Sequence, residues 1–351
     1  MTDGSGEGRP IGARVKLTDI SSRAWEHPAD RGALTALRQL RGFDYVLRKL
    51  AGLWNERALR LVYLGAAVRV DHHQFPGVYR LYTQAASTLD VRDLPALYVY
   101  SDPQPRAMAL GIDHPFVVVN SGMIDMLDDD ELRFILGHEL GHVLSGHALY
   151  TTMLMQLLRV SNALSWLPIG ALGLRAVIAA LYEWSRKAEL SSDRAGLLAT
   201  QDPAAALRCH MKVASGGKLD DLDIAAFRAQ GEEYLGPPDV RDSVLKLLLL
   251  ENNTHPFAVV RAAELQRWVD DGAYTRVLRG DYPRRGDDRN ASMRTDAAEA
   301  ATHYRTAFER SQDPLVAMVR ELGGTVAGIR DRMNAFFTGR DEGGNTSDDV
   351  T

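Results

Sequence analysis

The 351-residue chain has a single cysteine, Cys209. One cysteine excludes a disulfide within the chain and a zinc site built from a cysteine cluster. It fits a reducing compartment, and we expect the protein in the cytoplasm. The polar, glycine-rich start, MTDGSGEGRPIG, lacks the apolar core of a signal peptide.

An excess of positive charge is also missing, because the net charge is −5 and the sequence pI about 6.1. Such a weakly acidic chain argues against nucleic acid as a partner. The chain is 45% hydrophobic and 25% charged. That balance is typical of a globular protein with a sizeable core.

A long uninterrupted apolar run is absent as well. The longest stretch without a charge, Val160–Leu174, has fifteen residues and is bounded by Arg159 and Arg175. Crossing a bilayer as a helix takes roughly 20 apolar residues. For the whole apolar region that follows Tyr150 and ends at Leu181, we therefore predict two buried helices with a bend near Pro168. A membrane hairpin or a peripheral attachment to a membrane surface is the alternative.

What the chain does have is the motif H-E-x-x-H, formed by His138, Glu139 and His142. Residues four apart on a helix share a face, so the two imidazoles can bind one Zn²⁺. The Glu between them can accept a proton from a water at the metal. The alternative is a helix with two surface histidines.

The residues around the motif favour a helix. Asp128 and Glu131 have the spacing of a capping box, and leucines recur at helical intervals after them. Gly137 and Gly141 each cost a helix about 1 kcal/mol. Close packing or access to a site is the expected reason for these glycines.

The third ligand has to lie downstream of the motif. The extended pattern H-E-x-x-H-x-x-G-x-x-H fails, because Ser145 and Ala148 stand where it needs glycine and histidine. His147 is therefore not the third ligand, and we expect it to be structural. The same expectation applies to three histidines without a partner pattern: His114, His210 and His303.

A second acidic helix supplies the candidate. In EWSRKAELSSDRAG, Glu189 and Asp193 are four apart and share a helical face, whereas Glu183 lies on another face. A carboxylate ligand, with a second carboxylate that accepts the free N–H of a ligating His, is the usual arrangement around zinc. The alternative is a solvated charged helix face.

Three short runs with β character precede the motif: 97–100, 107–111 and 116–120. They predict a small antiparallel sheet. The last run lies nearest to the expected cleft and could pair with an extended peptide if it is an exposed edge. Its candidate substrate-binding residues are Val117, Val118, Val119 and Asn120. A plain core strand is the alternative.

Taken together, the motifs resemble those of the HtpX-like and CAAX-prenyl-endopeptidase group of gluzincin metallopeptidases. HELGH is followed about 47 residues later by SRKAELSSDRAG, and NNTHPFAVVRAAELQRW resembles the T-H-P-x-x-x-x-R segment of that group. The resemblance covers roughly 74–268. It implies an α+β, predominantly helical, zincin-like fold with the small sheet beside the metal helix.

The resemblance also implies roles for individual residues. By analogy, His138, His142 and Glu189 bind zinc, Glu139 is the general base, and Asp193 is the outer partner of a ligand. His255 matches a histidine that contacts the substrate or the oxyanion. The chain departs from the group at Arg106, where relatives commonly carry Asn, and in lacking clear transmembrane helices.

The whole sequence is interpreted in five segments. We expect a disordered tail over 1–14, a metallopeptidase domain with an N-terminal helical part over 15–270, and a charged loop or linker over 271–296. A C-terminal helical segment, 297–338, precedes a second disordered tail, 339–351.

These observations predict a zinc endopeptidase acting on peptides or unfolded proteins, with a role in protein quality control. A zinc-binding chaperone or scaffold without hydrolysis is the alternative. The sequence does not indicate an oligomeric state.

Overall fold

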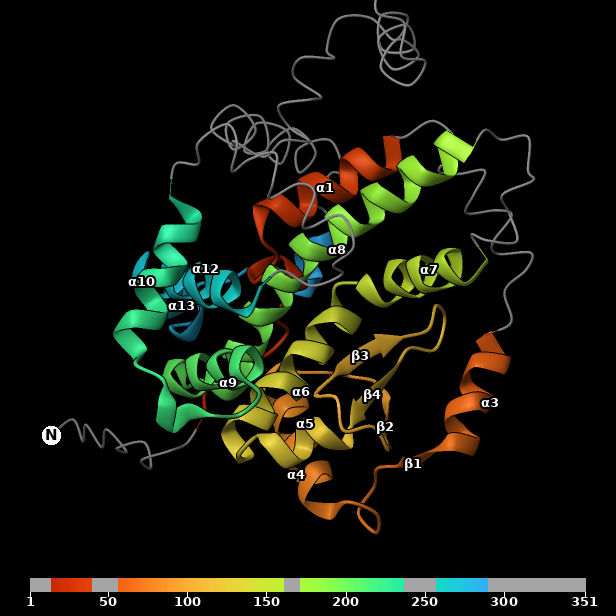
Figure 1. Ribbon diagram of the computed structural model, residues 1–351, viewed down its shortest axis with the longest axis horizontal. Coiled ribbons are helices and arrows are strands. Elements are labelled where there is room, and N and C mark those ends of the chain that lie inside the picture. The colour runs from red at the N-terminus through yellow and green to blue at the C-terminus, as the bar shows by residue number, and fades with distance from the viewer. Residues whose placement is uncertain (1–13, 40–55, 161–170, 237–256, 290–351) are drawn as a thin grey trace, which may run out of the picture.

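A computed structural model describes residues 14–39, 56–160, 171–236 and 257–289 of the chain. In this part the protein is a predominantly helical α+β structure with one small sheet (Figure 1). The strands are β1 (Ala67–Arg69), β2 (Ala96–Tyr100), β3 (Ala107–Leu110) and β4 (Phe116–Asn120). The α-helices are α1 (Pro28–Gln39), α3 (Glu56–Ala66), α4 (Pro76–Thr88), α5 (Ser121–Met126), α6 (Asp129–Leu144), α7 (His147–Val160), α8 (Ala171–Thr200), α9 (Pro203–Ser215), α10 (Ile224–Leu235), α12 (Ala258–Asp270) and α13 (Ala273–Leu278). Short 3-10 helices are η1 (Ser22–Ala24), η2 (Leu219–Asp221) and η3 (Arg285–Arg289).

The sheet has the strand order β1-β2-β4-β3. β1 and β3 run antiparallel to their neighbours, but β2 and β4 pair in parallel, so the sheet is mixed and not purely antiparallel as expected. The parallel pair arises because β3 is inserted between β2 and β4 in sequence yet lies outside β4 in space. The three predicted strands are confirmed, and the structure adds β1 as a fourth.

The two faces of β4 belong to different cores. Val117 and Val119 point into the main core with α4 and α6. Phe116 and Val118 point the other way, into a smaller cluster with Leu59 of α3. The alternation follows from the period of two in a strand. A strand that is covered on both faces reads as a continuous apolar run, which explains the sequence FVVVN.

Helix α6 lies at the centre of the molecule. The predicted capping box is present, since Asp128 accepts from the backbone N–H groups of Asp130 and Glu131, and Glu131 accepts from the backbone of Asp128. From Glu131 to His142 every residue is buried. The helix packs against α4, α8, α9 and β3, which explains why its apolar residues are not confined to one face.

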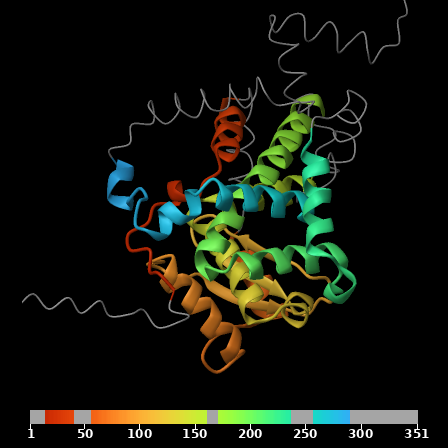
Figure 2. The same cartoon turned by 90° about the vertical axis from the view of Figure 1, so that its left-hand side faces the viewer.

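Helix α8 runs beside α6, and α1 and α7 pack on the N-terminal half of α8 (Figures 1 and 2). Two helices were predicted for this apolar region, and α7 and α8 confirm them. The bend expected near Pro168 lies outside the described residues. Among the described helices, none combines the length and apolar character that crossing a membrane requires.

Residues near both ends of the described chain pack against the helices and the sheet and contact one another. Leu17, Ile20 and Trp25 are buried in the main core, and the Trp25 indole donates to Ser145 at the end of α6. Ser21 bonds to Asp288 of η3. Part of the segment expected to be a loop or linker, 271–296, is therefore helical and packed.

Of the expected N-terminal tail, only Arg14 is described. Its guanidinium contacts Thr200 and Asp130. The expected C-terminal segments, 297–338 and 339–351, lie outside the described residues.

Candidate metal centre

The site begins with an unusually close approach of α6 and α8. A Cβ added to Gly137 would lie 2.3 Å from the Ala199 Cβ, and one added to Gly141 would lie 2.5 Å from the Ala195 Cβ. Neither position can accept a side chain without moving a helix. Close packing therefore explains both glycines, and it sets the spacing between the two ligand-bearing helices.

Three buried side chains converge between these helices: His138 and His142 of α6 and Glu189 of α8. The Nε2 atoms of the two histidines are 3.1 Å apart. Glu189 Oε1 lies 3.2 Å from His142 Nε2, and Glu189 Oε2 lies 3.5 Å from His138 Nε2. The structure thus brings together the three residues that the sequence predicted as ligands.

Each histidine also has a polar contact on its outer side. His138 Nδ1 lies 3.0 Å from Asp193 Oδ1, so this nitrogen carries a proton and Nε2 presents its lone pair to the centre. His142 Nδ1 lies 3.1 Å from His147 Nδ1. Asp193 occupies the position predicted for an outer partner.

The arrangement fits a metal ion on chemical grounds. Two imidazole lone pairs and a carboxylate oxygen face one another at 3.1–3.5 Å in a buried space. Without a cation, these electron pairs repel, and burial strengthens the repulsion. Two histidines and a glutamate are a donor set that zinc commonly accepts, and three protein ligands leave an open position.

The pKa values of the two histidines reflect this crowding. Burial by itself lowers the pKa of His138, but hydrogen bonds to Asp193 and Glu189 outweigh burial and raise it to about 9. Burial lowers the pKa of His142 to about 4, because Glu189 compensates only in part. The carboxylates beside His138 therefore favour positive charge at this position, whereas burial dominates at His142.

Glu139 lies next to the ligands and is equally buried. Burial raises the pKa of its carboxyl to about 7, although the positive charge of His138 opposes this shift. A backbone hydrogen bond from Ala109 of β3 also favours the ionised form. A carboxyl with a pKa near neutrality can both accept and return a proton at physiological pH.

Arg261 of α12 is a member of the site that was not assigned from the sequence. Its guanidinium bonds to both oxygens of Asp193 at 2.8 and 2.5 Å, and it lies 3.0 Å from Glu189 Oε2. These two carboxylates hold the Arg261 pKa above its usual range despite burial. The available signal was its place as the final residue of the T-H-P-x-x-x-x-R segment.

Asp30 of α1 is the second residue that was missed. Its Oδ2 lies 3.0 Å from His147 Nε2, and the His147 ring in turn contacts ligand His142. His147 does not belong to the cluster of His138, His142 and Glu189, and it is buried next to His142. No pattern in the sequence connects Asp30 with residues more than 100 positions away.

The expectation that Val117, Val118, Val119 and Asn120 bind substrate is not supported by the sheet. These residues form β4, which is paired on both edges, and none is more than 4% exposed. The Asn120 side chain donates to the Gln104 backbone. An extended peptide has no free edge to join at β4, so the core-strand alternative is correct.

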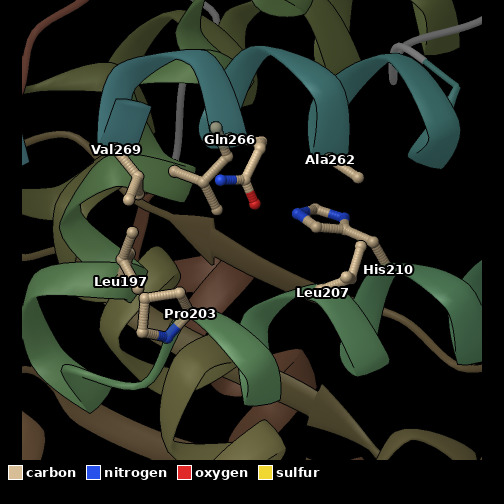
Figure 3. A pocket seen from close by; sticks show the side chains of 8 residues that line it. Leu197, Pro203, Leu207, His210, Ala262, Gln266 and Val269 are labelled. Carbon is tan, nitrogen blue, oxygen red and sulfur yellow. The ribbon is translucent and has the colours of Figure 1, made fainter. Parts of the chain in front are cut away.

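Four further histidines considered in the sequence analysis have different positions. His255 and His303 lie outside the described residues, and His114 is exposed. His210 of α9 is buried, and its ring points toward Ala262 of α12 in a small apolar pocket (Figure 3). That pocket has a volume of about 10 Å³, room for about one water. It is too small for a ligand.

Comparison with known proteins gives a consistent result. Residues 72–269 match the model of Peptidase family M48. The chain is similar to the Plastoglobule-localized metallopeptidase 48, chloroplastic, of Arabidopsis thaliana, with 31% identity over 74% of this chain and 76% of that protein. It is also similar to a Protease HtpX homolog of Tropheryma whipplei (strain Twist), with 28% identity over 41% of this chain and 58% of that protein. No solved structure matches.

Proposed function

The chain belongs to peptidase family M48, and from this premise we propose that it is a zinc-dependent endopeptidase acting on flexible or unfolded proteins. The observation that carries the proposal is the convergence of His138, His142 and Glu189 beside the buried carboxyl of Glu139. All four side chains belong to two helices whose spacing is fixed by close packing. A rigid frame of this kind favours a preorganised catalytic centre.

Glu139 is the proposed general base. His138, His142 and Glu189 would hold the zinc ion, which would supply the Lewis acidity needed to activate water and polarise a peptide carbonyl. Glu139 accepts the proton of the attacking water and returns it to the leaving amine. Its pKa of about 7 suits both transfers.

The proposed peptide-binding edge is β3, not β4. Within the described residues, β3 pairs only with β4 and packs against α6 and α7. A peptide chain added along the outer edge of β3 would form backbone hydrogen bonds beside the Ala109 amide, which also contacts Glu139. This placement puts a peptide carbonyl near the general base. His255 remains proposed as a contact to the oxyanion, by resemblance to the family.

Peripheral attachment to a membrane is part of the proposal and rests on α3. Leu61 and Leu64 are each 55% exposed, and they line a surface groove with Arg57 and Arg60. Apolar and cationic side chains on one helical face are typical of binding to an anionic lipid surface. Flotation with vesicles of phosphatidylglycerol and phosphatidylcholine tests it. Binding that is equal for the wild type and for Leu61→Glu/Leu64→Glu would remove α3 from the proposal.

The principal experiment is digestion of unfolded casein by purified protein. We expect cleavage at internal peptide bonds, loss of cleavage with a zinc chelator and recovery on adding zinc, with fragments mapped by mass spectrometry. A non-hydrolytic chaperone would instead suppress casein aggregation and leave the chains intact. Proteomic comparison of cells carrying the native protein or Glu139→Gln then identifies substrates and tests a role in quality control.

A further inference from the structure

The candidate metal ligand His142 is the first of three buried polar side chains that contact one another in a row. His142 Nδ1 lies 3.1 Å from His147 Nδ1, and His147 Nε2 lies 3.0 Å from Asp30 Oδ2. The three residues are 7%, 3% and 2% exposed. They come from α6, α7 and α1, so three separate helices meet at this row of side chains.

The position of each proton follows from the acceptors. The Asp30 carboxylate can only accept, so His147 Nε2 carries the proton between them. With that proton on Nε2, the lone pair at His147 Nδ1 can accept from His142 Nδ1–H. His142 is left with its lone pair on Nε2, and this is the atom that faces His138 and Glu189.

Neighbouring side chains fix the positions of Asp30 and His147. The Ser191 hydroxyl of α8 donates to Asp30 Oδ2 at 2.6 Å and accepts from the His27 backbone N–H at 2.8 Å, which ties the start of α1 to α8. The Trp184 ring meets the His147 ring at 5.4 Å with an interplanar angle of 79°. Since both ends of His147 have defined contacts, its orientation is fixed by packing as well as by hydrogen bonds.

We propose that His147 and Asp30 are positioning residues that orient His142 for zinc, with Asp30 acting only through His147. The inference rests on the zinc binding of the proposed function. Asp193 performs the equivalent task for His138 by direct contact. Asp30 lies outside the residues 72–269 that match the family model, so the N-terminal helix supplies this support.

A purely structural role is the competing explanation, because the Asp30–His147 pair also links α1 to α7. The two explanations predict different zinc affinities for variants that lack the Asp30–His147 pair. Outer partners of metal ligands typically affect affinity by about 10–100-fold when lost. A pair that only links helices would lower thermal stability and leave the affinity of the folded protein unchanged.

The test measures zinc affinity of the full chain by competition with a chromogenic chelator, alongside thermal melting. His147→Phe keeps a ring against Trp184 but removes the acceptor for His142, and we expect zinc binding to weaken by about 10–100-fold. His147→Gln restores an acceptor oxygen and should recover part of the loss. Asp30→Asn should weaken binding to a smaller extent, because a neutral amide no longer fixes the His147 proton.

The double variant decides whether Asp30 acts through His147. In the His147→Phe background, Asp30→Asn should cause no further loss of zinc affinity, because the contact from Asp30 through His147 to His142 is already absent. Leu154→Ala, a buried change on α7, is the control for lowered stability and should melt earlier with native zinc affinity.

Three results would overturn the inference: native affinity in His147→Phe, losses that multiply in the double variant, or an equal loss in Leu154→Ala. Failure of the wild type to bind zinc would instead remove the proposed function itself.

Discussion

At the scale of single residues, the site is a set of buried charges that depend on one another. His138 and Glu189 face the centre, and Asp193 and Arg261 face them from outside. Every one of these groups would be costly to bury alone. Single substitutions should therefore separate into those that remove chemistry, those that remove the metal and those that destabilise the fold.

Glu139→Gln should abolish peptide cleavage and leave zinc bound. The amide cannot accept a proton, and Glu139 is not among the three converging ligands. Loss of a general base typically costs about 10²–10⁴-fold in rate. Peptide turnover and metal content by atomic emission measure the two effects on one sample. Native turnover in this variant would contradict the proposed mechanism.

Glu189→Ala should lose zinc, because it removes the only carboxylate ligand of the described cluster. The matched control is Glu183→Ala on the same helix, six residues earlier, which is out of phase with the metal-facing side. Zinc stoichiometry after dialysis distinguishes them. If Glu183→Ala loses the metal and Glu189→Ala retains it, the ligand assignment is wrong.

Arg261→Met should lower the free energy of unfolding by about 3–5 kcal/mol, the range for removing one partner of a buried ion pair. The substitution leaves Asp193 and Glu189 without the cation that lies 2.5–3.0 Å from each. Arg267→Met is the control from the same helix, because Arg267 is 44% exposed in its ion pairs and should cost at most about 1 kcal/mol. Urea unfolding of both variants measures the difference, and equal losses would argue against a central role for Arg261.

At the scale of elements, α6 and α8 determine the site through their contact. The ligands stand on two helices that share an interface of Gly137, Gly141, Ala195 and Ala199. Small residues at a helix crossing let the backbones approach closely. The positions of His138 and His142 relative to Glu189 therefore depend on residues that contact no metal.

Gly141→Ala should destabilise the protein by about 1–3 kcal/mol, the usual cost of overpacking. Its added methyl group would need space that the Ala195 Cβ already fills at 2.5 Å. Gly77→Ala in α4 is the control, because no atom lies within 4 Å of the place that its new methyl group would take, and the change should stabilise by up to about 1 kcal/mol. Thermal melting of both variants tests the contrast, and a stabilised Gly141→Ala would show that the helices can separate freely.

The sequence predicted α6 well because its signals are local. The Asp128 capping box, the helical spacing of leucines and the H-E-x-x-H motif all lie within one short stretch. Glu189 was found because a helical face could be inferred around it. The edge assignment of β4 was wrong because strand order depends on which distant strands pair, and that information is not in the run FVVVN.

The outer contacts of the site were the least predictable part. Arg261 lay in a recognised segment without an assigned partner, and the contact from Asp30 to His147 joins helices far apart in sequence. Such contacts follow from tertiary packing, which neither periodicity nor residue spacing reports. They are also the contacts that complete the electrostatics of the centre.

At the scale of the whole molecule, the only cysteine is an internal probe of unfolding. Cys209 is 1% exposed, and burial raises the pKa of its thiol above the usual range. It should react with a thiol reagent only when the fold opens. Because a ligand that binds the folded state stabilises it, adding zinc should slow the labelling and a chelator should accelerate it.

Rates of Cys209 labelling under native conditions measure this coupling. Denatured protein is the control and should label at the rate of a free thiol. Labelling at that rate in the folded, zinc-loaded protein would show that Cys209 is accessible and would contradict the buried position.

The N-terminal segment has a practical consequence for how the protein is divided. A gene fragment trimmed to residues 72–269 would follow the family match and yet omit Trp25 and Asp30 from one end and Tyr274 from the other. It would expose the apolar surface that Trp25 covers, with aggregation as the expected result. An expression unit that keeps the main core has to include Leu17 at one end and Val277 at the other. Homology boundaries and folding boundaries differ in this protein.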